Sequence, residues 1–331
     1  MMKKLAVTCV LVLAVVLVGG LSEAATRFIV AHNQTSHENP YQYGMLKFKE
    51  VLERLSGGAF EVDVHAGTIG TNEDELVEKL QLGAADMIVA SPRFMTRVGI
   101  PEVDMFSLLY LYSGFPHWER VVDGEVGAKF AEIINEKSNN TFRISAYWSA
   151  GVRNYYGRRP IERIEDLNGM TIRTQMSGVV ADFWTQIGAI PTQVAWGELY
   201  QALQQGVVDS AENDYTNFSL LDHHKTANGR FITETEHDYT TRLLLMNGNR
   251  WDAYSDQQKA WITEAVKEAT AEERRVTYDQ LDKSKERVIT EGGVVNTIDK
   301  APFTAIAVPI QDELAKSLGL EDLLQAIRDA D

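Results

Sequence analysis

Two arginines and one asparagine of this 331-residue chain could together bind a carboxylate. Arg173 lies near the end of an alternating stretch, 170–174, that predicts a short strand. Arg153 follows a glycine in a predicted corner, and Asn213 ends the strand predicted after residue 206. A guanidinium offers two parallel donors that match a carboxylate, and an amide can both donate and accept. Because ligands of open α/β sheets bind beyond the carboxyl ends of strands, we expect Arg173 and Asn213 to face one crevice, with Arg153 as a second cation.

Each of these three residues also has a purely structural interpretation. An arginine near a strand end is often part of a surface ion pair, and a salt bridge between Arg153 and one of the many acidic residues stays open. An asparagine often forms a turn. Trp148 fits equally well as an aromatic wall of a site or as a core residue. Polar residues at strand ends or helix starts nearer the N-terminus are expected to form the opposite wall and contact hydroxyl groups: His32, Asn33, Glu73, Ser91 and Arg93.

The elements that would position these residues predict an α/β fold. Strands and helices alternate in the first ninety residues, which indicates a largely parallel sheet with helices on its faces. Helices are expected at 40–55 and 118–136, on either side of an irregular apolar stretch at 91–113, and near Ser177 and at 198–205. Strands are expected at 27–31, 60–64, 87–90, 142–147, 231–232, 241–246 and 294–297.

One predicted helix is unusually long. Ser255 is a plausible N-cap, and Gln258 stands at the position that completes a capping box. From there to about residue 290 the pattern is helical and nearly free of breakers. The sequence shows no internal repeat and no low-complexity linker, so two lobes would have to be joined by several crossings of the chain.

The N-terminus predicts a secretory signal peptide. Lys3 and Lys4 precede an apolar run at 5–18, and small residues follow up to Ala24, after which we expect cleavage. An uncleaved anchor is the alternative, but the run is shorter than the roughly 20 residues that span a bilayer comfortably. Cys9 lies inside this run, so the mature chain, exported to the periplasm, would contain no cysteine.

Composition limits the partners of the chain. The formal charge is −15, and it becomes −16 once Lys3, Lys4 and Glu23 are removed from the 32 basic and 47 acidic residues. Such a surface argues against nucleic acid and anionic membranes as partners, but not against an anionic ligand in a locally positive site. Residues 25–331 are enough for two domains of ordinary size.

Enzyme motifs are weak. The mature chain would lack a cysteine nucleophile and has no Gly-x-Ser-x-Gly elbow, and 67–70 lacks the Gly-Lys-Ser/Thr of a phosphate loop. His223 and His224 are adjacent rather than four residues apart, as a helical zinc pair requires. A metal site at 234–237 is conceivable from its glutamates and histidine, but a solvated acidic face explains them better. We therefore expect no catalytic residue, no metal and no cofactor.

Three stretches carry a family resemblance. Residues 169–173 read Gly-Met-Thr-Ile-Arg, residues 151–153 read Gly-Val-Arg, and residues 198–213 read Glu-Leu-Tyr-Gln-Ala-Leu-Gln-Gln-Gly-Val-Val-Asp-Ser-Ala-Glu-Asn. In these the chain resembles the DctP-type solute receptors of the tripartite ATP-independent periplasmic (TRAP) transporters. The resemblance implies that Arg173 clamps a substrate carboxylate and that Arg153 lines the site. It also implies that Trp196, just before the predicted helix, packs on the ligand, although a core role is the simpler interpretation.

The resemblance implies a two-lobed periplasmic binding protein fold with a hinge cleft and a long helix that spans both lobes. Lobe I is expected to comprise 25–150 and about 239–275, and lobe II 151–238 and about 276–331. The function implied is capture of an organic acid anion and its delivery to the membrane subunits of a transporter. The alternatives are a secreted hydrolase that uses Glu and His residues, and a ligand-sensing partner of a membrane receptor.

The polar first-lobe residues and the tryptophan favour a sugar acid such as a uronate. A small hydroxy- or keto-acid, an aromatic acid and a dicarboxylate remain open. Ser91 and Pro92 follow the strand predicted at 87–90 where the sialic-acid binders of the family carry an acid, which argues against a sialic-acid ligand.

Overall fold

A computed structural model describes residues 24–174 and 178–331, so the charged and apolar stretch that predicts a signal peptide lies outside the described residues. Nine strands form one sheet. Their bounds are β1 Thr26–His32, β2 Phe60–Ala66, β3 Met87–Ala90, β4 Phe142–Gly157, β5 Thr171–Thr174, β6 Ile190–Gln193, β7 Ser210–Asn213, β8 Phe231–Asn247 and β9 Val294–Thr297.

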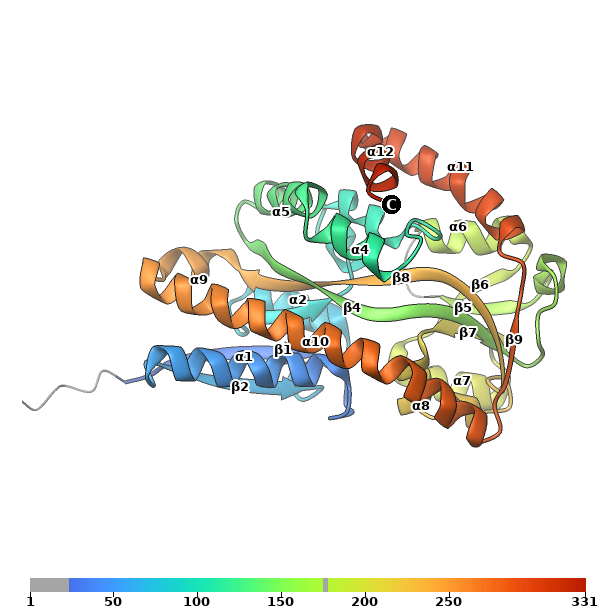
Figure 1. Ribbon diagram of the computed structural model, residues 1–331, viewed down its shortest axis with the longest axis horizontal. Coiled ribbons are helices and arrows are strands. Elements are labelled where there is room, and N and C mark those ends of the chain that lie inside the picture. The colour runs from blue at the N-terminus through green and yellow to red at the C-terminus, as the bar shows by residue number, and fades with distance from the viewer. Residues whose placement is uncertain (1–23, 175–177) are drawn as a thin grey trace, which may run out of the picture.

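Helices cover both faces of this sheet (Figure 1). The α-helices are α1 Pro40–Ser56, α2 Glu73–Gln81, α3 Arg93–Arg97, α4 Phe115–Val122, α5 Glu125–Lys137, α6 Gly178–Ile187, α7 Leu199–Gln205, α8 Tyr215–Leu220, α9 Gly248–Ala253, α10 Asp256–Thr290, α11 Ala301–Leu318 and α12 Glu321–Asp329. Short 3-10 helices are η1 Pro101–Ser107, η2 Ile164–Leu167, η3 Trp196–Glu198 and η4 His223–Lys225.

The sheet has the order β2-β1-β3-β8-β4-β7-β5-β6, with β9 beside β8. Strands β1–β3 form one end, which we call the first lobe, and β5–β7 form the other, the second lobe. The long strands β4 and β8 run through both lobes. The α/β class is confirmed, but the expected largely parallel sheet is mixed: β4 pairs antiparallel with β7 and β8, and β3 pairs antiparallel with β8.

Two predicted boundaries were wrong. The strands expected at 231–232 and 241–246 are parts of the single strand β8, and the helix expected at 118–136 is interrupted between α4 and α5 at Asp123 and Gly124. This turn requires glycine, because a Cβ at Gly124 would lie 2.5 Å from the carbonyl oxygen of Arg120. The predicted start of α6 near Ser177 lies outside the described residues.

Helix α10 confirms the long helix and its start. The Ser255 side chain accepts the backbone N–H of Gln258, and the Gln258 side chain accepts the N–H of Ser255, which completes the capping box. The helix packs on α1 and β4 in the first lobe and on α8 in the second (Figure 1). It therefore connects the two lobes as one continuous helix.

The C-terminal helices contact elements of both lobes. Helix α11 packs on η1 and α6, and α12 packs on α5. The assignment of 276–331 to the second lobe stays a prediction for this reason. No helix within the described ranges has both the length and the apolar character needed to cross a bilayer.

Helix α10 buries a carboxyl group where it crosses β4. Glu273 is fully buried and accepts the backbone N–H of Ser149 at 3.2 Å and the hydroxyl of Thr277 at 3.0 Å. Burial raises the pKa of Glu273 to about 8, and these hydrogen bonds together with Arg274 and Arg242 oppose the rise only in part. The folded protein therefore holds a proton here at neutral pH.

We expect Glu273 to lower the stability of the protein as the pH rises. The unfolded carboxyl ionises near pH 4.5 and the folded one near pH 8. Between these values the unfolded state binds fewer protons, so the free energy of unfolding falls with rising pH. Glu273→Gln keeps the acceptor and cannot ionise. Urea unfolding near pH 6 and near pH 8 measures this effect. Between the two pH values the free energy of unfolding should fall by roughly 1–2 kcal/mol more in the wild type than in the variant. An equal fall in both proteins would contradict the prediction.

Candidate ligand-binding site

A cavity of about 290 Å³ lies between the two lobes. It is bordered by the carboxyl ends of β1, β5, β6 and β7 and by the first turn of α2. This is where open α/β sheets bind ligands, and the volume suits a molecule the size of one sugar ring. The first lobe contributes Asn33, Gln34, Asn72, Glu73, Asp74, Phe94 and Arg242, and the second contributes Arg173, Thr174, Gln193, Val194, Ala195, Trp196, Asn213 and Asn217.

Arg173 is the buried cation of the second lobe. Its side chain is 2% exposed, its Nε donates to the carbonyl oxygen of Val194 at 3.0 Å, and its guanidinium lies 5.7 Å from the Trp196 ring centroid. Its Nη1 is buried and has no hydrogen-bond partner among the described residues. Burial lowers the pKa of Arg173 to about 10, so the group is still a cation at neutral pH. The protein thus holds Nε, whereas no residue in the described part of the chain pairs with Nη1.

The Asn213 side chain is fixed in place by a hydrogen bond from Arg153. The Asn213 Oδ1 accepts from Arg153 Nη1 at 3.0 Å and from the backbone N–H of Asp214 at 2.9 Å. Because this oxygen is already engaged twice, the amide nitrogen is the group that can serve a ligand, as a donor.

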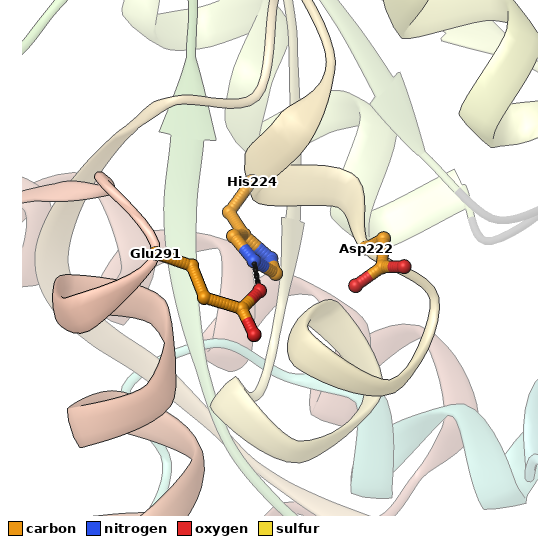
Figure 2. A group of neighbouring side chains, drawn as sticks. All are labelled: Asp222, His224 and Glu291. Carbon is orange, nitrogen blue, oxygen red and sulfur yellow. Dashed lines mark hydrogen bonds and ion pairs between the residues drawn. The ribbon is translucent and has the colours of Figure 1, made fainter.

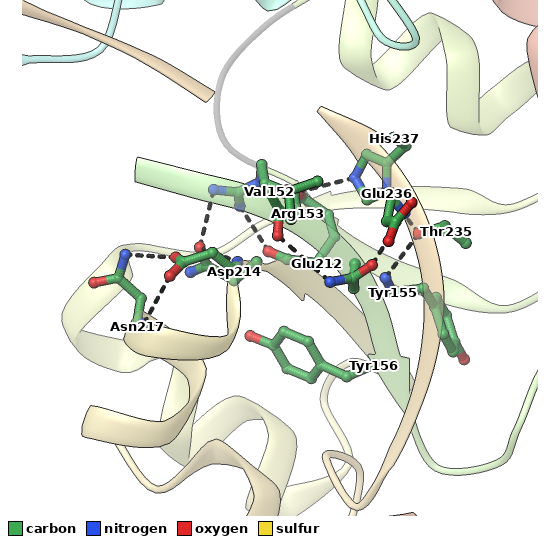
Figure 3. A network of polar contacts seen from close by, with 12 residues as sticks. Val152, Arg153, Tyr155, Tyr156, Glu212, Asp214, Asn217, Thr235, Glu236 and His237 are labelled. Carbon is green, nitrogen blue, oxygen red and sulfur yellow. Dashed lines mark hydrogen bonds and ion pairs between the residues drawn. The ribbon is translucent and has the colours of Figure 1, made fainter. Parts of the chain in front are cut away.

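Arg153 is a fully buried member of a polar network, as Figure 3 shows. It forms an ion pair with Glu212 through Nε, and its Nη2 donates to the Glu212 carbonyl oxygen at 2.6 Å. His237 approaches the same carboxylate at 3.4 Å. Although burial opposes it, the Arg153 charge holds the pKa of Glu212 far below its ordinary value. Arg153 is not among the residues that line the cavity, so the structure places it behind Asn213 rather than in contact with a ligand.

Arg242 is a cavity residue that the sequence interpretation missed. It is 4% exposed, and its Nη1 donates to Glu73 Oε1 at 3.1 Å, while Glu73 Oε2 accepts the Ser91 backbone N–H at 2.6 Å. The Nε of Arg242 is buried without a partner in the described part of the chain. The sequence does contain a signal for this residue, a single arginine directly before the apolar run 243–246. A charged side chain next to buried apolar residues is seldom found unless it has a partner or a ligand.

The two lobes touch across the cavity rim. Asn39, the N-cap of α1, donates its amide to Asn217 Oδ1 at 3.1 Å, and Asn217 donates to Asp214 Oδ1 at 2.7 Å. The Asp214–Asn217 contact appears in Figure 3. The Asn39–Asn217 bond thus joins the two lobes beside the cavity.

Five of the ten predicted site residues line the cavity: Arg173, Asn213, Trp196, Asn33 and Glu73. The other five lie outside its lining: Arg153, Trp148, His32, Ser91 and Arg93. Trp148 is wholly buried and donates to Thr270 at 3.0 Å, so it belongs to the core. His32 pairs with Gln42 at 3.0 Å, and burial lowers the pKa of His32 to about 4, which keeps it neutral.

Arg93 lies outside the lining, yet it is 7% exposed and carries two buried nitrogens, Nε and Nη1, without partners among the residues described. Burial, followed by the charge of Arg153, lowers its pKa. Ser91 serves the site only through its backbone, as the donor to Glu73. The polar wall expected from the first lobe is therefore present, but only Asn33 and Glu73 of the predicted residues belong to it, beside Gln34, Asn72, Asp74 and Arg242.

A second cluster of titratable groups lies away from the cavity. Asp222, His224 and Glu291 place potential metal-ligand atoms within 4.8 Å of one another (Figure 2). Lys225 contacts both carboxylates, at 3.0 and 2.9 Å, and Arg287 contacts both, at 2.8 and 3.0 Å. Two cations thus already neutralise these acids, which makes the cluster an ion-pair network between η4 and the end of α10.

Two α/β lobes with a cavity between them define the class of the two-lobed solute-binding proteins. The chain belongs to the DctP family, the bacterial extracellular solute-binding proteins of family 7, whose sequence profile matches residues 30–317. The family consists of solute-binding proteins and not of enzymes, which excludes the hydrolase alternative.

Several relatives are similar over most of their length. A solute-binding protein of Chromohalobacter salexigens is 28% identical over 85% of this chain and 83% of its own. The C4-dicarboxylate-binding periplasmic protein DctP of Rhodobacter capsulatus is 26% identical over 86% of both chains. A TRAP periplasmic solute-binding protein of Roseobacter denitrificans, solved with bound β-D-glucuronate, matches with a TM-score of 0.85 and 28% identity over 91% of this chain and 98% of that chain. The resemblance inferred from the sequence is confirmed.

Proposed function

We propose that this protein captures a uronate in the periplasm and delivers it to the membrane subunits of a TRAP transporter. The observation that carries the proposal is the buried guanidinium of Arg173, which faces an enclosed cavity with Nη1 unpaired among the described residues. A uronate carboxylate would complete this fork and would also accept from the Asn213 amide. The glucuronate in the Roseobacter denitrificans structure supports a sugar acid of this size.

The first lobe would recognise the ring hydroxyls. Glu73 and Arg242 are already joined by a hydrogen bond, so they present a fixed pair of an acceptor and a donor to the cavity. Asn33 adds an amide held by Gln34 at 3.1 Å. Trp196 offers an aromatic face to the ring. A neutral sugar would leave the Arg173 cation desolvated and unpaired, so it should bind poorly.

Capture would require the lobes to open and close about β4, β8 and α10, the elements that run through both. We propose that the two lobes move as rigid bodies with the boundaries expected from the sequence. The Asn39–Asn217 hydrogen bond would then be one of the contacts that stabilise the closed state. Export through the signal peptide is part of the same proposal. The relatives are transport proteins, which favours delivery to a transporter over signalling to a receptor.

A ligand screen tests the proposal. Thermal shifts and calorimetry should be measured with D-glucuronate, D-galacturonate, D-glucose and succinate. We expect the uronates to bind in the micromolar range or more tightly and glucose to give no shift. A larger thermal shift with succinate than with the uronates would indicate that the natural ligand is a dicarboxylate. The absence of a thermal shift with every acid would contradict the carboxylate clamp.

A further inference from the structure

The first half of β4 is an edge of the sheet. Strand β8 pairs with β4 from Phe142 to Gly157, with register shifts near Ser145, 150–151 and Asn154, whereas β7 pairs only with residues 154–157. On the side away from β8, residues 142–149 border no other strand of the described chain. At the far end of this edge, Arg274 donates to the carbonyl oxygen of Tyr147 at 2.8 Å, and Ser149 donates to Glu273. Residues 143–146 lie before these two hydrogen bonds, so their edge of the sheet is open. An open edge is a template for a further strand.

A groove of about 580 Å³ follows this edge. Five consecutive residues, 143–147, line it. Neighbouring side chains of a strand point to opposite faces, so a groove that touches all five must run along the backbone. Figure 1 shows this part of β4 between α5 and α10. The wall at α5 is formed by two glycines and two alanines: Gly124, Gly127, Ala128 and Ala131. Ile262, Val266, Thr270 and Ala271 contribute to the α10 wall.

The groove is basic on an acidic protein. Arg143, Lys267 and Arg274 line it against a single acid, Asp123, although the whole chain carries a formal charge of −15. Arg274 is paired with Asp123, at 2.6 and 2.8 Å. The guanidinium of Arg143 stacks 4.5 Å from the centroid of the Trp251 ring and forms no ion pair within the described residues. Lys267 is exposed, and its ion pair with Glu264 is long, at 3.4 Å, so an anionic partner could compete for its charge as well as for that of Arg143.

We propose that this groove binds an extended acidic segment of a partner protein, which pairs with β4 as an additional strand. Backbone pairing along 143–146 would supply affinity, and carboxylates on the segment would meet Arg143 and Lys267. The paired stretch would be four or five residues long, because residues 143–147 span roughly 13–17 Å as a strand. This site lies outside the ligand cavity and does not depend on which solute the cavity holds.

A short peptide in which glutamate alternates with valine is the probe. Titrated into the full-length mature chain and followed by amide NMR shifts, it should perturb residues 143–147 and the facing surfaces of α5 and α10. A peptide with lysine in place of glutamate tests charge, and a peptide N-methylated at alternate residues tests backbone pairing. Both should bind about tenfold more weakly or worse.

Two matched tryptophan substitutions on α10 test the location. Ala271 is exposed and lines the groove, whereas Ala260 is exposed on the same helix and does not. Ala271→Trp should fill the groove and weaken the glutamate peptide at least about tenfold, Arg143→Glu should weaken it by a similar factor, and Ala260→Trp should leave it within about twofold. The melting temperature of the unliganded protein and its circular dichroism spectrum should stay close to wild type in all three, which shows that they fold.

Several results would overturn the proposal. They are equal binding of the N-methylated peptide, equal loss in Ala260→Trp and Ala271→Trp, shifts that cluster away from 143–147, and absence of any shift at about 1 mM peptide. Displacement of the peptide by free succinate at the same concentration would show a small-anion site instead. Self-association that blocks the groove would show a second copy of this chain as its occupant.

Discussion

Arg173→Met is expected to weaken uronate binding about a thousandfold, a loss of ~4 kcal/mol. The guanidinium is 2% exposed and faces a cavity from which a bound ring would exclude water. Removing one partner of a desolvated, hydrogen-bonded charge pair costs roughly 2–5 kcal/mol, because the carboxylate is left buried and unpaired. Arg173→Lys keeps the charge but loses the fork, so it should recover only part of the affinity. Isothermal calorimetry with glucuronate at pH 7 measures both.

Stability measurements separate lost binding from lost folding. Burial lowers the pKa of Arg173, which means that the empty site holds a cation at a cost to stability. Arg173→Met should therefore unfold at the same temperature as the unliganded wild type or higher. Arg158→Met is the matched control, because Arg158 is half exposed and pairs with Asp209 away from the cavity. Affinity within about tenfold of wild type in Arg173→Met would contradict the clamp.

Much of the fold could be predicted because its signals are local. The capping box at Ser255 and Gln258, the length of α10 and the strand β9 each depend on neighbouring residues, and all three agree with the structure. The continuity of β8 could not be predicted in this way. Its middle, residues 234–240, is polar and does not resemble a strand; there Asp238 and Tyr239 pair with β4, and Glu234 pairs with β9. Such pairing joins residues far apart in the chain.

The site was predictable where a residue's position along a strand decided its role. Arg173 and Asn213 stand at the ends of β5 and β7 and line the cavity, as expected from strand ends that meet at one edge of a sheet. Arg153 was not predictable, because its place depends on Glu212, 59 residues away. Of the two interpretations open for Arg153, the structure shows the salt bridge. Trp148 likewise packs in the core because α1 and α10 cover it. These helices are distant in the sequence, so the residues around Trp148 could not predict this packing.

Glu212→Ala is expected to destabilise the protein by about 3–5 kcal/mol, because it leaves the Arg153 guanidinium buried without a counter-charge. Arg153 is 2% exposed and Glu212 is 2% exposed. The pKa of Glu212 is held far below its ordinary value, so its stabilising contribution is fully present at neutral pH and is lost progressively as the pH falls below about 4.5 toward the folded value. Urea unfolding at pH 7, followed by tryptophan fluorescence, measures the loss.

A double variant and an exposed pair serve as controls for Glu212→Ala. Arg153→Met combined with Glu212→Leu removes both charges at similar volume, so most of the lost stability should return. Uronate affinity should not return with it, because Asn213 loses the Arg153 donor that engages its Oδ1. Glu272→Ala breaks the exposed pair with Arg275 and should cost less than about 1 kcal/mol. If the double variant were as unstable as Glu212→Ala, the buried unpaired charge would not be the cause, and the loss would instead arise from the Glu212 contacts to His237 and the strands around it.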